Sequence, residues 1–177
     1  DAVVVGAGTV AADDPQLTVR HVKGRDPRPI VIDGSLRSSP EAQVYRQPGA
    51  ILVTAEKTPA RKRRAYADKG AEVWTFPARA GRIDLRLPLA RAAAEGMTAV
   101  LIEGGGELAA AALADQVVDQ VQLYLAPRLM GTGVEAIGDL GIERAAEAIQ
   151  LTSVRTRRLG ADLLYTAEVQ YACSPDS

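Results

Sequence analysis

The stretch "LIEGGGELAAAALAD", residues 101–115, decides the fold class of this chain. Apolar residues lead into Gly104–Gly106, and an alanine-rich segment that reaches Gln116 follows without a linker. This order predicts a strand, a glycine turn and a helix. Glycines let a ligand approach the backbone amides, and a helix N-terminus attracts anions such as a pyrophosphate. A tight strand–helix turn without a ligand is the alternative, because the spacing is not that of a dinucleotide fingerprint.

Glu103 stands directly before the glycines, at the predicted carboxyl end of its strand. Open α/β sheets bind their ligands along that edge. A phosphate site repels a neighbouring carboxylate, so Glu103 is expected to face an adjacent substrate instead. A solvated carboxylate with no role in binding is the other interpretation.

Short apolar runs alternate with helical segments along most of the chain, which predicts an α/β sheet with helices on both faces. The predicted strands are Ala2–Gly6, Ile30–Ile32, Ile51–Val53, Glu72–Thr75, Ala99–Ile102 and Val121–Ala126. Two further helices are predicted at Pro59–Lys69 and Leu89–Glu95, closed by Gly70 and Gly96. Two long runs around Gly160 predict a terminal antiparallel hairpin. We expect one domain over residues 1–177, with three α/β/α layers around a mixed, mostly parallel sheet of about eight strands.

The composition restricts the classes of function. Apolar residues make up 47% of the 177 residues, charged residues make up 24%, and the formal net charge is −1. This balance is that of an ordinary globular protein and argues against a nucleic-acid surface. No apolar run is long enough to span a membrane. The single Cys173 and the single His21 argue against a disulfide framework and a metal site, so we expect a cytoplasmic protein that acts on small molecules.

Several other features are expected to be structural. The basic run Arg61–Arg64 is interpreted as a solvated helix face in preference to an RNA or 2′-phosphate site. Trp74 and Tyr124 are expected to pack in the core. Residues 174–177 are expected to form a frayed tail.

The first twenty residues, "DAVVVGAGTVAADDPQLTVR", begin with a buried strand followed by a GxG turn. The turn is not the Rossmann motif, because Ala11 stands where the third glycine is required. The pair Asp13-Asp14 precedes Pro15, which ends any helix within a few residues. Paired aspartates before a proline are typical of turns and caps more often than of catalytic sites.

Four blocks carry a resemblance to a known family. They are, in order, "GAGTVAADDPQLTVR", "PRPIVIDGSLRSSP", "IEGGGELA" and "VDQVQLYLAPRLMGTG". Together they resemble the reductase domain of bacterial bifunctional riboflavin-biosynthesis proteins, which is a 5-amino-6-(5-phosphoribosylamino)uracil reductase with a dihydrofolate-reductase-like fold. The resemblance implies an NADPH-dependent enzyme that reduces the ribosyl group of this phosphorylated pyrimidine to the ribitylamino product.

The resemblance also assigns roles to individual residues. It places Thr9 and Asp13 on the nicotinamide cofactor, and Leu17 and Arg20 on the substrate, with Arg20 suited to the 5′-phosphate. It places Glu103 on the substrate, where it is the candidate catalytic residue. The cofactor phosphates fall on Gly105, Gly106, Glu107, Leu108, Ala109, Ala110 and Ala111.

Three departures from the family pattern leave alternatives open. Gly34 stands at a cofactor position that is usually a serine, and Glu107 stands where a neutral hydroxyl residue is common. The family's first strand and helix are not in this chain, so we expect other residues or another chain to fill their place. The zinc deaminase half is not in the chain either, and we expect a homodimer that can be fused or associated with one. The alternatives are a nucleotide-binding module without turnover and a reductase of another pyrimidine or pterin.

Overall fold

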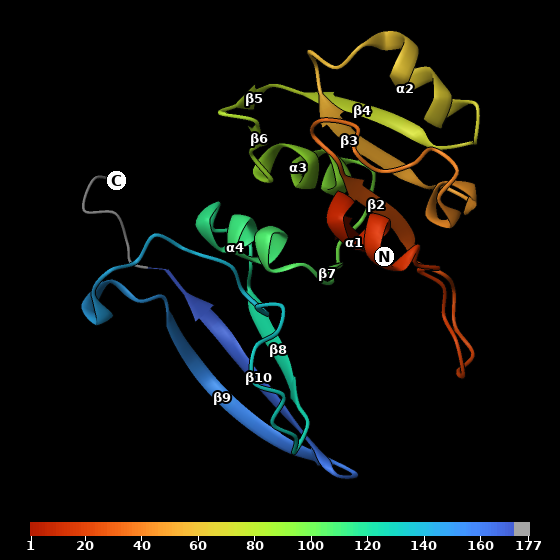
Figure 1. Cartoon of the computed structure of the whole chain (residues 1–177). Helices are drawn as coiled ribbons and strands as arrows, with labels where there is room; N and C mark the ends of the chain where they lie inside the picture. Colours follow the sequence, from red (N-terminus) through yellow and green to blue (C-terminus); the bar gives the residue numbers. More distant parts are fainter. Residues whose placement is uncertain (172–177) are drawn as a thin grey trace.

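A five-stranded parallel sheet forms the centre of the computed structural model, which describes residues 1–171 (Figure 1). Its strand order is β4-β3-β2-β1-β7. The strands are β1 (Ala2–Gly6), β2 (Arg28–Ile32), β3 (Ile51–Ala55), β4 (Glu72–Phe76) and β7 (Val100–Ile102). The chain adds three strands on one side of β1 and then crosses to its other side for β7. The strand order therefore reverses at β1, which is where open α/β sheets form a ligand crevice.

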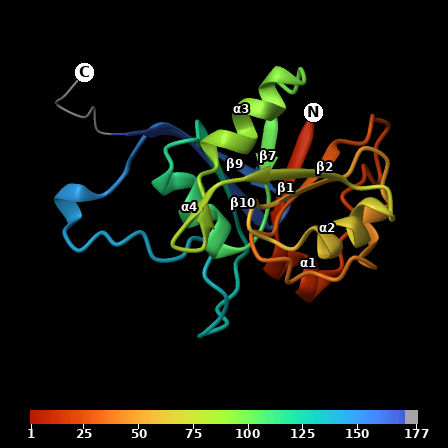
Figure 2. The same ribbon diagram turned by 90° about the horizontal axis from the view of Figure 1, so that it is seen from above.

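Helices cover both faces of this sheet, and Figure 2 shows them from above. Apolar side chains from α1 (Ala7–Asp13), the 3-10 turn η1 (Gln43–Arg46) and α2 (Ala60–Ala67) join one buried cluster. Side chains from α3 (Arg86–Ala94) and α4 (Gly106–Ala114) join a second buried cluster. These are named the α1–α2 cluster and the α3–α4 cluster below. The predicted three layers and the α/β class are confirmed.

The strands β1 to β4 contribute side chains to both clusters, because successive side chains of a strand point to opposite faces. In β1, Val4 joins the α3–α4 cluster, whereas Val3 and Val5 join the α1–α2 cluster. Burial of one such side chain stabilises the fold by about 1.5–3 kcal/mol. Trp74 is 0% exposed in the α3–α4 cluster, which confirms its predicted packing role.

The helix boundaries differ slightly from those predicted. The helix predicted at Leu89 begins at Arg86 instead, because Pro88 lies in its first turn, where no backbone donor is needed. Gly70 and Gly96 follow the ends of α2 and α3 with φ of 101° and 85°, as expected for glycines that close a helix. Within residues 1–171, no helix combines the length and the apolar character that crossing a membrane requires.

The C-terminal strands form a separate antiparallel sheet in the order β8-β10-β9. Its strands are β8 (Gln120–Leu125), β9 (Gln150–Leu159) and β10 (Asp162–Gln170). The predicted hairpin is confirmed, with Gly160 at φ 63° in its turn. The expectation of one continuous sheet is wrong: β7 and β8 end their respective sheets and do not pair with each other in the described part of the chain. A small unpredicted hairpin, β5 (Ala78–Arg79) and β6 (Arg82–Ile83), follows β4.

The antiparallel sheet is largely solvent-exposed. Nine of the ten residues of β9 are exposed, and only Leu159 is partly covered. Tyr124 of β8 is 66% exposed, so its predicted place in the core is wrong. The reason is that no described element packs over this side chain. Cys173 and the expected frayed tail of residues 174–177 lie outside the described residues.

A buried hydrogen-bond network fixes the loop that leaves β2. The Asp33 side chain is 1% exposed and accepts hydrogen bonds from the Arg37 backbone (2.9 Å) and from the Ser38 backbone and hydroxyl (2.8 and 2.7 Å). The Ser38 hydroxyl meets the Tyr45 hydroxyl at 2.7 Å, and Tyr66 donates to the Ser38 carbonyl at 2.6 Å. Burial raises the pKa of both tyrosines above the ordinary value, so both stay protonated at neutral pH.

Replacing Asp33 should therefore destabilise the fold. In Asp33→Asn an amide N–H group faces donors, which leaves buried groups unpaired and lowers the free energy of unfolding by about 1–3 kcal/mol. Urea denaturation at neutral pH measures this change. The control Asp68→Asn alters an exposed carboxylate at the C-cap of α2 and should change the same quantity by less than about 0.5 kcal/mol. An equal loss in both variants would show that the network contributes nothing specific.

Candidate functional site

A cavity of about 610 Å³ opens beside the point where the strand order reverses. Glu103, directly after β7, forms part of its wall, and the loop that follows α1 forms another part. Three residues predicted to bind substrate, Leu17, Arg20 and Glu103, line this one cavity although more than eighty residues separate Arg20 from Glu103. Asp13, predicted to bind cofactor, lines it as well.

The loop that carries Leu17 and Arg20 spans residues 14–27 and contains neither helix nor strand. It projects from the sheet as a long arm (Figure 1). Leu17 packs against the α1–α2 cluster, which ties its part of the loop to the core. Arg20 is exposed, so its guanidinium can meet an anionic group of a ligand.

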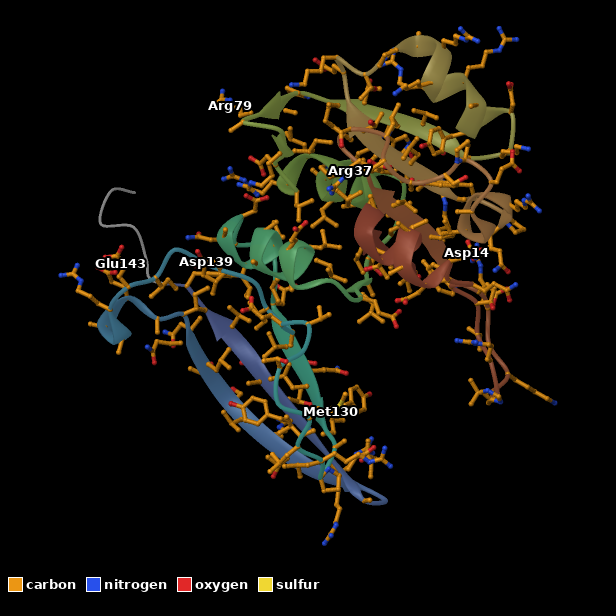
Figure 3. The ribbon with its side chains drawn as sticks, in the orientation of Figure 1. Asp14, Arg37, Arg79, Met130, Asp139 and Glu143 are labelled. Atoms are coloured by element: carbon orange, nitrogen blue, oxygen red, sulfur yellow. The ribbon has the colours of Figure 1, made fainter. Side chains whose placement is uncertain are left out.

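The cavity wall also contains carboxylates. The Glu103 backbone N–H donates to the Val4 carbonyl at 2.8 Å, which continues the pairing of β7 with β1 and fixes the direction of the chain. The Glu103 side chain is exposed. Asp14, labelled in Figure 3, lies at the end of α1. Hydrogen bonds from the backbone and side chain of Gln43 hold the pKa of Asp14 below its ordinary value, so this carboxyl stays ionised at neutral pH.

Next to the cavity, the glycine turn takes backbone conformations that favour glycine. Gly104 and Gly105 have φ of 72° and 77°. Thr9, from the start of α1, packs against them: a Cβ on Gly105 would lie 3.2 Å from the Thr9 hydroxyl oxygen. The structure thus brings together Thr9 and the glycines, which the resemblance assigned to one cofactor.

The N-terminus of α4 offers free backbone donors. The N–H groups of Leu108 and Ala109 donate to the Gly105 carbonyl at 3.0 and 3.1 Å. The N–H groups of Gly106 and Glu107 have no hydrogen-bond partner among residues 1–171, and no side chain caps the helix. Free N–H groups together with the helix dipole suit an anion such as a phosphate.

Gly106 has a second role that the sequence did not indicate. Its carbonyl accepts a hydrogen bond from the Gly138 N–H at 2.9 Å. A Cβ on Gly106 would lie 2.6 Å from the Glu135 carbonyl oxygen, which no real side chain tolerates. Glycine is therefore required here by the approach of the chain's own backbone.

The remaining residues of the predicted phosphate stretch differ in their surroundings. Leu108 and Ala110 are each 7% exposed, so their side chains pack inside and only their backbone is available to a ligand. Ala111 packs against the α3–α4 cluster, and Glu107 is exposed in the first turn of α4. Gly105 and Ala109 line a second cavity.

The second cavity has a volume of about 840 Å³ and lies between β7 and β8. Leu101, Leu113, Val121 and Leu123 contribute apolar side chains to its wall. Leu101 is 56% exposed, because no described helix covers this face of β7. The open edges of both sheets thus border one apolar space.

Gly34 lies outside both cavities. A Cβ at this position would lie 3.5 Å from the Gly81 carbonyl oxygen and 3.8 Å from the Ile83 side chain, so Gly34 packs against the β5–β6 hairpin. The structure does not bring it together with the residues around Glu103. Gln43, by contrast, lines the first cavity and was not predicted, because a lone glutamine in a short turn matches no motif.

The chain resembles proteins of riboflavin biosynthesis in sequence. It is 36% identical over 175 residues to the chloroplastic riboflavin biosynthesis protein PYRR of Zea mays, across 96% of this chain but 27% of that protein. It is 35% identical over 170 residues to the 2,5-diamino-6-ribosylamino-4(3H)-pyrimidinone 5′-phosphate reductase of Methanothermobacter thermautotrophicus, across 93% of this chain and 77% of that protein.

Solved structures show the same fold. RibD of Acinetobacter baumannii superposes with a TM-score of 0.77 at 23% identity, over 96% of this chain and 47% of that chain. The riboflavin biosynthesis reductase Rib7 of Saccharomyces cerevisiae superposes with a TM-score of 0.74 at 18% identity, over 96% of this chain and 76% of that chain. The family model for the RibD C-terminal domain matches residues 1–165. Since this match covers most of the chain and the archaeal reductase is similar over 77% of its own length, the chain belongs to the RibD C-terminal domain family.

Proposed function

We propose that this chain is a cytoplasmic, NADPH-dependent reductase that converts the ribosyl group of 5-amino-6-(5-phosphoribosylamino)uracil to the ribitylamino group. One observation carries the proposal: Leu17, Arg20 and Glu103 converge on a single cavity beside the free N–H groups of α4. Relatives named as reductases of this pathway support it.

In this proposal the substrate occupies the cavity of about 610 Å³. Arg20 binds the 5′-phosphate, because its planar guanidinium offers paired N–H donors to phosphate oxygens. Leu17 contacts the pyrimidine or ribose through its apolar side chain. The ribose then lies toward Glu103, at the carboxyl end of β7.

The residues around the glycine turn fit a nicotinamide dinucleotide. The free N–H groups of Gly106 and Glu107 suit its phosphates, and Thr9 adjoins the same turn. When bound, NADPH supplies the hydride. The exposed Glu107 side chain has to point away from the phosphates, because a carboxylate beside them weakens binding.

Glu103 is the proposed catalytic residue. Reduction at the ribose C1′ requires the sugar ring to open, and the ring oxygen then gains a proton as its bond to C1′ breaks. A carboxyl group beside the ribose can deliver that proton or stabilise the charge that develops. Its place at a strand end, held by the Val4 carbonyl, fixes the backbone from which the side chain projects.

A nucleotide-binding module without turnover is the second candidate. Gly34 favours it, since this position lacks a hydroxyl group and lies against the β5–β6 hairpin outside both cavities. NADPH oxidation, monitored with the enzymatically deaminated pyrimidine as substrate, separates the two functions. Oxidation with formation of the ribitylamino product supports the reductase, and NADPH binding without oxidation supports the module.

The open edges of β7 and β8 offer places where a further strand or another chain can bind. We propose that a strand from outside the described residues fills the apolar space between them in the working enzyme. We also propose a homodimer, and a fused or associated deaminase domain, as the resemblance implies; this chain covers 47% of the RibD protein of Synechocystis. Analytical ultracentrifugation tests the dimer, and a monomer at working concentration contradicts it.

Replacing Glu103 should separate chemistry from binding. Glu103→Gln keeps the shape but cannot transfer a proton, so turnover should fall by about a hundredfold or more while NADPH affinity stays unchanged. Steady-state kinetics and calorimetry measure the two effects. The matched control is Glu56→Gln, because Glu56 follows β3 as Glu103 follows β7. Normal turnover of Glu103→Gln would show that Glu103 is a surface carboxylate without a catalytic role.

Replacing Gly105 should weaken cofactor binding. In Gly105→Val a branched Cβ fills the space at the turn, so the affinity for NADPH should fall by at least about tenfold. The control is Gly96→Val, whose φ of 85° is close to the 77° of Gly105 and which faces open space at the end of α3. Both variants carry similar backbone strain, of about 1–3 kcal/mol. If calorimetry gives the same NADPH affinity for both variants, Gly105 is not part of the cofactor site.

A further inference from the structure

The loop of residues 14–27 needs an external support to place its side chains. Inside the loop, the Val19 N–H donates to the Asp26 carboxylate at 2.8 Å. Beyond the loop, its hydrogen-bond partners in the part of the chain that the structure describes are Val10, in the helix just before it, and Gln43. Gln43 is therefore the one long-range polar anchor of the described loop.

Gln43 contacts the loop through its backbone N–H and through the nitrogen and the oxygen of its side-chain amide. Its backbone N–H donates to Asp14 Oδ1 at 2.8 Å. Its Nε2 donates to Asp14 Oδ2 at 2.9 Å and to the Asp14 carbonyl at 3.2 Å. Its Oε1 accepts a hydrogen bond from Gln16 Nε2. One side chain thus joins the first and third residues of the loop.

The residue that Gln43 holds has an unusual backbone. Asp14 ends α1 in the left-handed conformation, with φ 40° and ψ 58°. Such a conformation costs a non-glycine residue about 1–2 kcal/mol and persists only where the surroundings enforce it. The direction of the chain at Asp14 sets the start of the loop that carries Leu17 and Arg20, and Leu17 is held in addition by its packing against the α1–α2 cluster.

The residues that follow Gln43 attach it to the core. Gln43 begins η1, whose next two residues, Val44 and Tyr45, are each 0% exposed. The Tyr45 hydroxyl joins the buried network of Ser38 and Asp33. A loop fastened to Gln43 is thereby fastened to the core on the α1–α2 face.

We infer that Gln43 is a positioning residue, which holds residues 14–20 so that Leu17 and Arg20 face Glu103 across the cavity. The inference rests on the proposed function, in which this cavity binds the phosphorylated pyrimidine. Gln43 touches neither Glu103 nor the glycine turn in any described hydrogen bond. Its loss should therefore weaken substrate binding and leave the chemistry and the cofactor site intact.

The experiment compares steady-state kinetics of the full chain and of Gln43→Ala. The KM for the pyrimidine substrate should rise by about tenfold, whereas kcat and the KM for NADPH should change by less than about twofold. Asp14→Gly keeps the left-handed backbone but removes the carboxylate, and should raise the same KM. Asp14→Asn keeps an acceptor for the Gln43 N–H but places an N–H group where Oδ2 accepts from Gln43 Nε2, so it should raise this KM less than Asp14→Gly does.

The control variant is Glu41→Gln. Glu41 lies two residues before Gln43 and pairs with Arg46 and Lys69, not with the loop. The Glu41→Gln substitution should leave the KM for the pyrimidine and the KM for NADPH unchanged. Hydrogen–deuterium exchange of residues 15–20 in the ligand-free protein gives a second readout, and should increase in Gln43→Ala but not in Glu41→Gln.

Three outcomes overturn the inference. An unchanged pyrimidine KM in Gln43→Ala shows that the anchor does not serve binding, even where exchange increases. A parallel loss of kcat, both KM values and thermal stability shows a general structural role. If the wild-type chain does not reduce the pyrimidine at all, the proposed function fails, and equal exchange in the wild type and Gln43→Ala then overturns the positioning role as well.

Discussion

The parallel pairing of β1 with β7 is the constraint on which the candidate site depends. Only three residue pairs form it, from Ala2 with Val100 to Val4 with Ile102, and the Glu103 N–H extends it by one hydrogen bond. Because both strands run the same way, their carboxyl ends meet at one edge. Residues 6–9 therefore lie beside residues 103–106, although about a hundred residues separate the two segments.

The central sheet could be predicted from sequence because β1, β2 and β3 are buried on both faces. Ile51, Leu52 and Val53 are each 0% exposed, and such continuous apolar runs have few other interpretations. The division into two sheets could not be predicted. An apolar run indicates a strand but not the neighbour with which it pairs, and β8 pairs with β10 and not with β7. The exposure of Tyr124 follows from the same division.

Part of the candidate site could be predicted from the residues themselves. The place of Glu103 at a strand end before the glycines indicated a carboxylate that faces a substrate, whereas Leu17 and Arg20 could be assigned only through the resemblance, since each taken alone is an ordinary loop residue. The need for glycine at position 106 was attributed to a ligand, whereas the structure shows the backbone of residues 135–138 against it. Contacts between backbones distant in sequence leave no pattern of residue types. The role of Gln43 was not predicted either, because its hydrogen-bond partners lie on the loop of residues 14–27, about thirty positions earlier in the sequence.

The contact between Gly106 and Gly138 limits how the long connection between β8 and β9 can vary in length. Insertions fit near Leu129 and Val134, which are 104% and 94% exposed. A deletion that moves Gly138 by one position brings Ile137 or Asp139 against the Gly106 carbonyl, where a Cβ has only 3.1 Å of room. The connection is thus divided into a part free to change in length and a part whose register is fixed. Homologous chains should differ in length before residue 135 and keep two small residues where these backbones meet.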